Sequence, residues 1–365
     1  MGKDFFKKFT EDTNVKLEMY EDYLMKWLPV FIVPPKPIRN TVNIMDLFCG
    51  PGKDEEGTLG SPLIALKVLK EYEGYIFRSP VTVNLYFNDK EQKHIDQLKL
   101  NIEEFGYRKD LINIHYSCTD FEELYPTINQ LASNSANLLF LDQFGIKYVN
   151  QDKFIEICQL SVTDLIFFIS STTFKRFHND KNINQILNLT SDEIQKEEFY
   201  KIHRLVHKAY NSFIPEGHSY GLAPFSIRKG TNVYGLIFGS GHPLGLEKFL
   251  DICWLKDETT GEANFDIQGD VKLKEQPSLF ATEEAKTLKI AVFQSQLEDA
   301  ILKGELTSDL QIYIFALNRG FTNKHIKPII SKLKKEKIID LKYPSFKCGT
   351  VWDRKRTPRV VQIIK

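Results

Sequence analysis

Short apolar runs alternate with amphipathic stretches along the first 170 residues of the chain. Five runs have the length and the β-branched and aromatic content of buried strands, at 43–48, 81–89, 113–120, within 136–145 and at 163–170. Apolar positions at helical spacing predict helices before and between them, at 13–31, 63–72, 91–105, 121–132 and 152–160. This alternation predicts an α/β fold with a mostly parallel sheet and helices on both faces.

The pattern changes after residue 170. The segment 173–215 is mostly polar and predicts a helical insertion. The runs 226–228 and 232–241 predict a closing antiparallel hairpin, which completes a seven-stranded sheet. A further helix ends this first domain, which we place at 1–257, and the polar segment 258–281 predicts a linker.

The C-terminal part predicts a second, smaller domain. Three short helices and two strand-like runs follow the linker, at 288–302, 309–318, 323–335, 338–343 and 360–364. The two runs are joined by a basic segment, which would form the tip of a hairpin. Three helices followed by a hairpin with a basic tip are the outline of a winged helix, so we expect such a domain at 282–365.

Charge and cysteine content narrow the class of protein. The net charge is zero, but residues 271–365 hold 19 Lys and Arg against 10 Asp and Glu, whereas the remainder holds 29 against 38. The basic C-terminal part is therefore the part expected to bind nucleic acid or an acidic partner.

Five scattered cysteines without a C-x-x-C pair favour a reducing cytoplasm over a disulfide framework or a zinc site. No apolar run has the length of a membrane span.

The first predicted strand runs into a glycine turn, "DLFCGPG", that ends at Gly52. It matches neither the P-loop nor the Rossmann fingerprint. About ten residues separate Gly52 from the next predicted helix, so no helix N-terminus follows the turn at once to hold a pyrophosphate. An acid just before the turn, Asp46, suits a ligand with an amino-acid end. Gly50 and Gly52 let the backbone approach an adenosyl group closely.

Acidic residues also end the next three predicted strands. Asp89 follows the second, where a carboxylate can accept from both hydroxyls of a ribose, and Asp120 follows the third, where it can accept from an adenine amino group. Asp142 follows the fourth and points to the same crevice, because ligands of open α/β sheets bind outside the carboxyl ends of the strands. This disposition is that of class I S-adenosylmethionine-dependent methyltransferases. The alternative is that polar residues simply end strands often.

The motifs "DLFCGPGKDEEGTLGSPLIAL", "YFNDKE", "LLFLDQFG" and "HPLGLEKFLDICWLKDETTGEANFD" resemble the three-Cys-motif partner proteins, a bacterial methyltransferase-like family. The resemblance runs over nearly the whole chain. It implies a Rossmann-like class I methyltransferase fold and S-adenosylmethionine, or S-adenosylhomocysteine as product, held by Asp46, Phe48, Gly50, Gly52, Asp89 and Asp120. It also implies a radical-SAM-like partner protein with three cysteines, encoded beside this protein in a phage-related or defence operon.

One motif departs from the family. The loop reads Asp142-Gln143-Phe144-Gly145, where the family commonly has D-P-F-G. In amino-group methyltransferases such a loop places an acid on the target amine and an aromatic ring on a flipped base, so Asp142 and Phe144 are the candidate catalytic residues. Gln143 stands where C5-cytosine methyltransferases need a cysteine, and Cys49 is on another strand, so we interpret Cys49 as a small core residue.

The expected phosphate contacts lie in the basic C-terminal part. They are Lys324 and Lys327 on a recognition helix, and Arg354, Lys355 and Arg356 at a wing tip. The alternative is a solvated face of a module that docks a protein.

His203 and His207 are four positions apart on a predicted helix, but the sequence offers no third metal ligand, so we expect a solvated face and no metal. The leading hypothesis is methyl transfer to nucleic acid; the rival is a non-catalytic adaptor that binds cofactor or partner.

Overall fold

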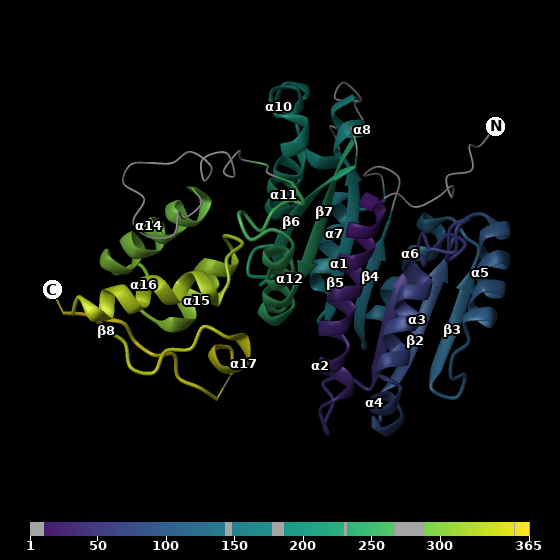
Figure 1. The fold of residues 1–365 in the computed structure, drawn as a ribbon, viewed down its shortest axis with the longest axis horizontal. Helices are drawn as coiled ribbons and strands as arrows, with labels where there is room; N and C mark the ends of the chain where they lie inside the picture. The colour runs from purple at the N-terminus through teal and green to yellow at the C-terminus, as the bar shows by residue number, and fades with distance from the viewer. Residues whose placement is uncertain are drawn as a thin grey trace. The chain divides into compact units, whose positions relative to one another are not determined.

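A computed structural model gives the structure of the chain and describes residues 11–142, 148–176, 186–229, 232–265, 267, 288–353 and 355–364. It divides into two compact units, Met1–Gly241 and His242–Lys365 (Figure 1). The second unit begins with helix α12 (Pro243–Lys256), which packs against other helices of that unit. The sequence pattern, by contrast, assigns this helix to the first domain.

A seven-stranded sheet with the order β3-β2-β1-β4-β5-β7-β6 forms the centre of the first unit. Its strands are β1 (Thr41–Asp46), β2 (Thr82–Asn88), β3 (Ile112–Ser117), β4 (Ala136–Leu141), β5 (Thr163–Ser170), β6 (Gly221–Lys229) and β7 (Asn232–Ser240). The first five are parallel, and β7 runs antiparallel to both β5 and β6. This confirms the seven-stranded, mostly parallel sheet that the sequence predicts for a Rossmann-like fold of the class I methyltransferase type.

The edge strand β6 is longer than the sequence predicts, because it starts at Gly221 and contains Pro224. A proline has no backbone N–H to donate to the hydrogen-bond ladder of a strand, so the sequence pattern around Pro224 does not indicate a strand. β6 is the outermost strand of the sheet, so only one of its sides is paired. The missing N–H is therefore tolerated at this position.

Helices cover both faces of this sheet (Figure 1). Those of the first unit are α1 (Glu11–Trp27), α2 (Pro29–Ile32), α3 (Ser61–Glu71), α4 (Glu73–Arg78), α5 (Gln92–Phe105), α6 (Phe121–Ala132), α7 (Gln151–Gln159), α8 (Ser171–Arg176), α10 (Ser191–Lys196) and α11 (Ile202–Phe213). The single helix predicted at 13–31 is divided into α1 and α2, because Pro29 has no N–H to continue the helical ladder.

The described part of the predicted insertion is not peripheral. Helix α11 turns Val206, Tyr210 and Phe213 into a buried cluster with the side chains of α6, α7 and one face of the sheet. The mostly polar composition of the segment hid this apolar face, which follows helical spacing. His203 is also fully buried and the His207 ring lies 3.3 Å from the Leu222 carbonyl oxygen, so the predicted solvated histidine face is wrong.

A row of four amide side chains crosses strands β1 to β4 near their amino ends and continues to a threonine of β5. Asn43, Asn84 and Asn113 are register partners on β1, β2 and β3, and Asn43 is also in register with Asn137 on β4. Each amide donates to the next: Asn113 to Asn84 at 3.0 Å, Asn84 to Asn43 at 2.9 Å, Asn43 to Asn137 at 3.0 Å. Asn137 donates to Thr163 of β5 at 2.9 Å. A one-residue slip of any strand would break this row, so it fixes the register of the sheet.

Among the described residues after 287, the second unit contains four further helices and two short strands. They are α14 (Leu288–Leu302), α15 (Asp309–Leu317), α16 (Asn323–Lys335), β8 (Ile339–Asp340), α17 (Cys348–Val351) and β9 (Gln362–Ile363). The strands pair antiparallel, and Ser308 bridges Val360 beside them. The connection between β8 and β9 is not a simple turn: it carries α17, which packs against α12 and α15.

The predicted linker is partly ordered. Residues 257–265 form turns in which the Asp257 carboxylate accepts from the backbone N–H groups of Thr259 and Thr260, at 2.9 and 3.1 Å. Gly261 lies against the Trp254 ring, and Ala263 is buried. The start of the segment is therefore packed onto α12, while residues 268–281 lie outside the described residues.

Candidate functional site

Four acidic residues lie at the carboxyl ends of four parallel strands. Asp46 is the last residue of β1, Asp89 follows β2, Asp120 begins α6 after β3, and Asp142 follows β4. Because these strands are parallel neighbours, their carboxyl ends meet at one edge. The sequence pattern placed all four residues at this edge, and the structure agrees; the role of each residue stays a prediction.

The glycine turn after β1 requires glycine for two reasons. Gly50 and Gly52 have φ angles of 59° and 85°, which L side chains rarely adopt. A Cβ on Gly52 would also lie 2.6 Å from Cδ1 of Leu98 on α5. Asn101 of α5 donates to the Pro51 carbonyl oxygen at 2.6 Å. The backbone of the turn is therefore held close against α5, with no side chain at Gly52.

As expected, no helix follows this turn at once along the chain, but the start of α3 returns to the turn in space. Residues 53–60 fold back on themselves: Lys53 and Leu59 form an antiparallel bridge, and the Gly60 N–H donates to the Gly52 carbonyl at 2.7 Å. Helix α3 therefore starts next to Gly52, although the two are separated along the chain. The positive end of an eleven-residue helix thus faces the glycine turn.

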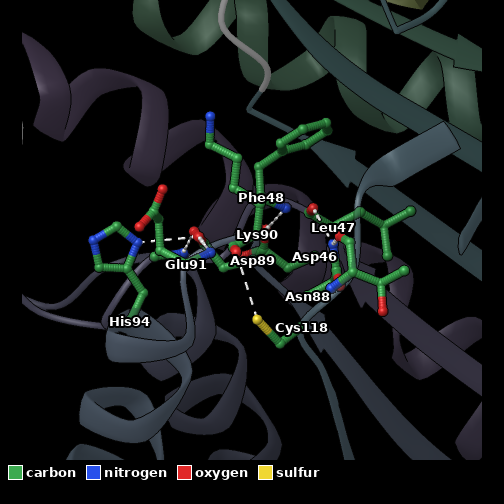
Figure 2. Close-up of polar contacts among 11 residues, drawn as sticks. Asp46, Leu47, Phe48, Asn88, Asp89, Lys90, Glu91, His94 and Cys118 are labelled. Carbon is green, nitrogen blue, oxygen red and sulfur yellow. Dashed lines mark hydrogen bonds and ion pairs between the residues drawn. The ribbon is translucent and has the colours of Figure 1, made fainter. Parts of the chain in front are cut away.

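Asp89 is tied to the glycine turn and to α5. Its Oδ2 accepts from the Gly50 N–H at 3.1 Å, and its Oδ1 accepts from the Glu91 N–H at 2.9 Å and lies 3.0 Å from Nδ1 of His94 (Figure 2). A carboxylate has about four acceptor positions, two on each oxygen. Oδ1 is thus filled and Oδ2 keeps one position. In this arrangement Asp89 can accept a hydrogen bond from one further hydroxyl. A bidentate contact with both hydroxyls of a ribose requires the His94 ring to move.

Asn88 was missed by the sequence analysis. It is buried, and its amide donates to the carbonyl oxygens of Leu47 at 3.3 Å and Thr119 at 3.0 Å. Its Oδ1 accepts from the Ser117 hydroxyl at 2.8 Å and the Thr119 N–H at 3.2 Å. One side chain thus joins the loops that follow β1 and β3. Figure 2 shows Asn88 beside Leu47 and Asp89. The sequence signal was an amide directly before a strand-end acid.

Asp120 and Phe48 lie on the outer parts of the edge. Asp120 is exposed and caps α6, its Oδ1 accepting from the Glu122 N–H at 2.9 Å. A capping carboxylate can still accept an amino group with its other oxygen. Phe48 is half-buried and stacks on Phe121 at 5.4 Å between ring centroids, with Tyr148 at 5.1 Å.

Asp46 is the most unusual group of the site. It is fully buried; Oδ1 accepts weakly from the Phe48 N–H at 3.4 Å, and Oδ2 has no hydrogen-bond partner among the described residues. Burial raises the pKa of Asp46 to about 7, and the Asp142 charge adds to the rise, while Ser61, the Phe48 N–H and Lys16 oppose it. A buried acceptor without a partner fits a site for a cationic ligand group.

The acid after β4 already has a partner that the sequence analysis did not foresee. Lys16 of α1 forms an ion pair with Asp142, and its ammonium lies over the Phe168 ring at 4.8 Å. Lys16 is 19% exposed and Asp142 37%, so solvent reaches this part of the edge. Phe144, the predicted stacking residue, lies outside the described residues.

The structure separates the predicted phosphate contacts of the second unit. Lys327 and Lys355 are exposed, and Lys324 is exposed with its ammonium 5.1 Å from the Trp254 ring. Arg356 instead turns inward: it pairs with the fully buried Asp309 and is only 13% exposed. It is therefore not available to a phosphate, because its charge compensates a buried carboxylate. Arg354 lies outside the described residues.

Two other features of the described residues bear on the chemistry. They contain no cluster of three or more His, Cys, Asp or Glu that could hold a metal, and no helix long and apolar enough to cross a membrane. All five cysteines are free, and Cys49 is buried, as expected for a core residue.

No protein-family model matches the chain, and no curated protein matches its sequence. Among solved structures, it is similar to a SAM-dependent methyltransferase from Agrobacterium tumefaciens, with 14% identity over 64% of this chain and 62% of that one, at a TM-score of 0.35. An O-methyltransferase from Bacillus cereus in complex with SAH gives 14% identity over 65% and 93% of the two chains, at 0.33. Trm1 from Pyrococcus horikoshii with S-adenosyl-L-methionine gives 12% over 98% and 92%, at 0.34.

The chain thus spans less than two thirds of the length of the first of these proteins. At these TM-scores the likeness carries no argument about activity, and the fold assignment rests on the strand order. The resemblance to the three-Cys-motif partner proteins stays a prediction.

Proposed function

We propose that the protein is an S-adenosylmethionine-dependent methyltransferase. The observation that carries the proposal is the edge formed by β1 to β4, where four acids surround a glycine turn that is closed on one side by the start of α3. A ligand with a nucleoside, a positive centre and an amino-acid end suits this combination. The buried, unpartnered oxygen of Asp46 fits such a ligand.

Each proposed contact follows from the geometry of one residue. Asp89 accepts from a ribose hydroxyl with the open position of Oδ2, and Asp120 accepts from the adenine amino group. Phe48 borders the base, and the backbone of Gly50 and Gly52 lies against the nucleoside. When bound, S-adenosylmethionine supplies an activated methyl group, so the chain needs only to bind and orient the two reactants.

We propose nucleic acid as the methyl acceptor, with Asp142 as the group that accepts a hydrogen bond from the target amine. Asp142 is partly exposed at the edge beside β1, and its pairing with Lys16 demonstrates that it can hold a nitrogen donor. We further propose that the second unit is a winged helix whose exposed Lys324, Lys327 and Lys355 contact phosphates. The radical-SAM-like partner implied by the family resemblance belongs to this proposal as well.

Calorimetry with S-adenosylhomocysteine tests the cofactor site. Asp89→Ala removes an acceptor that also holds the glycine turn, so affinity should fall by about 1.5–3 kcal/mol. Asp110→Ala is the matched control, because Asp110 is an exposed acid at the opposite end of the same strands, paired with Arg108 at 2.5 Å. Equal affinity of the Asp89 and Asp110 variants would contradict the assignment.

Mass analysis of nucleic acid after incubation with the protein and S-adenosylmethionine tests the reaction. Asp142→Ala should abolish methyl transfer while affinity for the cofactor stays within about twofold, because Asp142 orients the acceptor. Full turnover in that variant would remove Asp142 from the reaction. Cofactor binding without turnover on DNA or RNA would favour the adaptor, in which the same edge binds the ligand but performs no chemistry.

A further inference from the structure

Helix α1 places a tyrosine on the face of the sheet to which Asp46 points. The Tyr20 ring lies 4.2 Å from the Phe140 ring, and Phe140 of β4 is the register partner of Asp46 on β1. Register partners of parallel strands direct their side chains to the same face. Tyr20 therefore covers the sheet at the junction of β1 and β4, which is the point where the strand order reverses and where ligands of such sheets bind.

Two buried polar atoms near this junction lack hydrogen-bond partners among the described residues. The Tyr20 hydroxyl and the Asp46 Oδ2 atom are inaccessible to solvent and make no hydrogen bond among the described residues. Burial, with the Asp46 charge adding to it, raises the pKa of Tyr20 well above its usual value. The hydroxyl therefore stays an O–H donor, whereas Asp46 offers an acceptor. Since buried polar groups in proteins are nearly always satisfied, a group that both accepts and donates belongs here.

A zwitterionic amino-acid group has this combination. Its carboxylate accepts from Tyr20, and its ammonium donates to Asp46. The surrounding charges agree, because two carboxylates, Asp46 and Asp142, face the single ammonium of Lys16. Lys16 stands one helical turn before Tyr20 on α1, so one face of this helix supplies both residues.

We propose that Tyr20 and Asp46 form a buried subsite that binds the α-amino and α-carboxylate groups at the amino-acid end of the ligand. This inference rests on the proposed function and adds α1 to the binding site. It makes the site selective for ligands that carry an amino-acid end over nucleosides that lack one. Removing only the Tyr20 hydroxyl should therefore weaken the binding of ligands with an amino-acid end and leave the binding of simple nucleosides unchanged.

The test compares S-adenosylhomocysteine with 5′-methylthioadenosine, which has the same nucleoside and thioether but no amino-acid end. Tyr20→Phe should lower the affinity for S-adenosylhomocysteine about tenfold to a hundredfold, as for a hydrogen bond to a charged group. It should change the affinity for 5′-methylthioadenosine by less than about twofold. Tyr23→Phe is the matched control: it removes a buried hydroxyl from the same helix, one that donates to Asp164 at 2.6 Å. It should leave both affinities unchanged.

The nucleoside also reports folding, since a Tyr20→Phe protein that binds it normally has an intact site. Equal affinity of the parent and Tyr20→Phe for S-adenosylhomocysteine would overturn the subsite alone and indicate that water fills the position. Equal weakening of both ligands would also overturn it, since the hydroxyl would then support the fold. A parent protein that binds neither ligand would overturn the proposed function, and the subsite with it.

Discussion

Replacing the central amide of the asparagine row should destabilise the first unit far more than replacing the outermost one. Asn43 accepts from Asn84 and donates to Ser135 at 2.8 Å and to Asn137, and it is 2% exposed. Asn43→Leu keeps the branched shape of the side chain but removes all three hydrogen bonds. It leaves the Asn84 amide N–H without its partner in a buried position.

The magnitude follows from these contacts. One buried orphaned donor costs about 1–3 kcal/mol, and each of the other lost bonds about 0.5–1.5 kcal/mol. Burial of the added apolar surface offsets about 1 kcal/mol. Together these terms predict that Asn43→Leu lowers the free energy of unfolding by about 1–5 kcal/mol. Asn113→Leu, at the exposed end of the row, should cost less than about 1 kcal/mol, because water replaces its single bond to Asn84.

Hydrogen exchange of peptides that cover β1 is the appropriate assay, since a two-unit chain does not unfold in one transition. Exchange at β1 in increasing urea gives the opening free energy of the sheet itself. The reasoning is refuted if Asn43→Leu and Asn113→Leu exchange alike, because the row would then add nothing beyond the backbone ladder.

Three further predictions follow from single features. Gly52→Ala should lower the melting temperature and weaken S-adenosylhomocysteine more than Gly57→Ala does: both positions have a φ of 85°, but only at Gly52 does a Cβ meet a neighbour. Burial raises the pKa of Asp164 to about 6, so the folded state binds more protons than the unfolded state between about pH 4 and 6. Hydrogen exchange of β5 peptides in urea should show an opening free energy that falls over that range as pH rises, and Asp164→Asn should flatten this part of the profile. An unchanged profile would remove Asp164 as the cause. Replacing Lys324 and Lys327 by Gln should make the salt dependence of nucleic-acid binding shallower by about two phosphate contacts, whereas an unchanged slope would indicate a protein-docking face.

The sequence alone determined the elements and the edge that carries the site. Helices α6, α14 and α16 begin and end at the predicted residues, because helical spacing and polar or proline boundaries act within a few residues. Alternation of strands and helices is equally local, and it forces parallel strands whose carboxyl ends meet. The four strand-end acids could therefore be assigned to one edge without any knowledge of their contacts.

Only the tertiary structure decided which partners these residues have. Lys16 and Asp142 are 126 positions apart, and no local pattern indicates that α1 lies on the carboxyl end of β4. The same holds for Tyr20 beside Phe140, and for Arg356, whose place in a basic run suggests a surface contact but whose charge compensates the buried Asp309. Such pairings depend on how helices pack across a sheet, which is set by the sum of many weak apolar contacts.

The asparagine row and the return of α3 to Gly52 lie between these cases. An Asn stands among apolar residues near the start of each of the first four strands, so a signal was present in the sequence. It acquires meaning only when the register brings the four amides together. Likewise, residues 53–60 fix the chain length between the glycine turn and α3, but not its path. The path is decided by the Lys53–Leu59 bridge and the bond from Gly60 to Gly52, because backbone groups near the core must find partners.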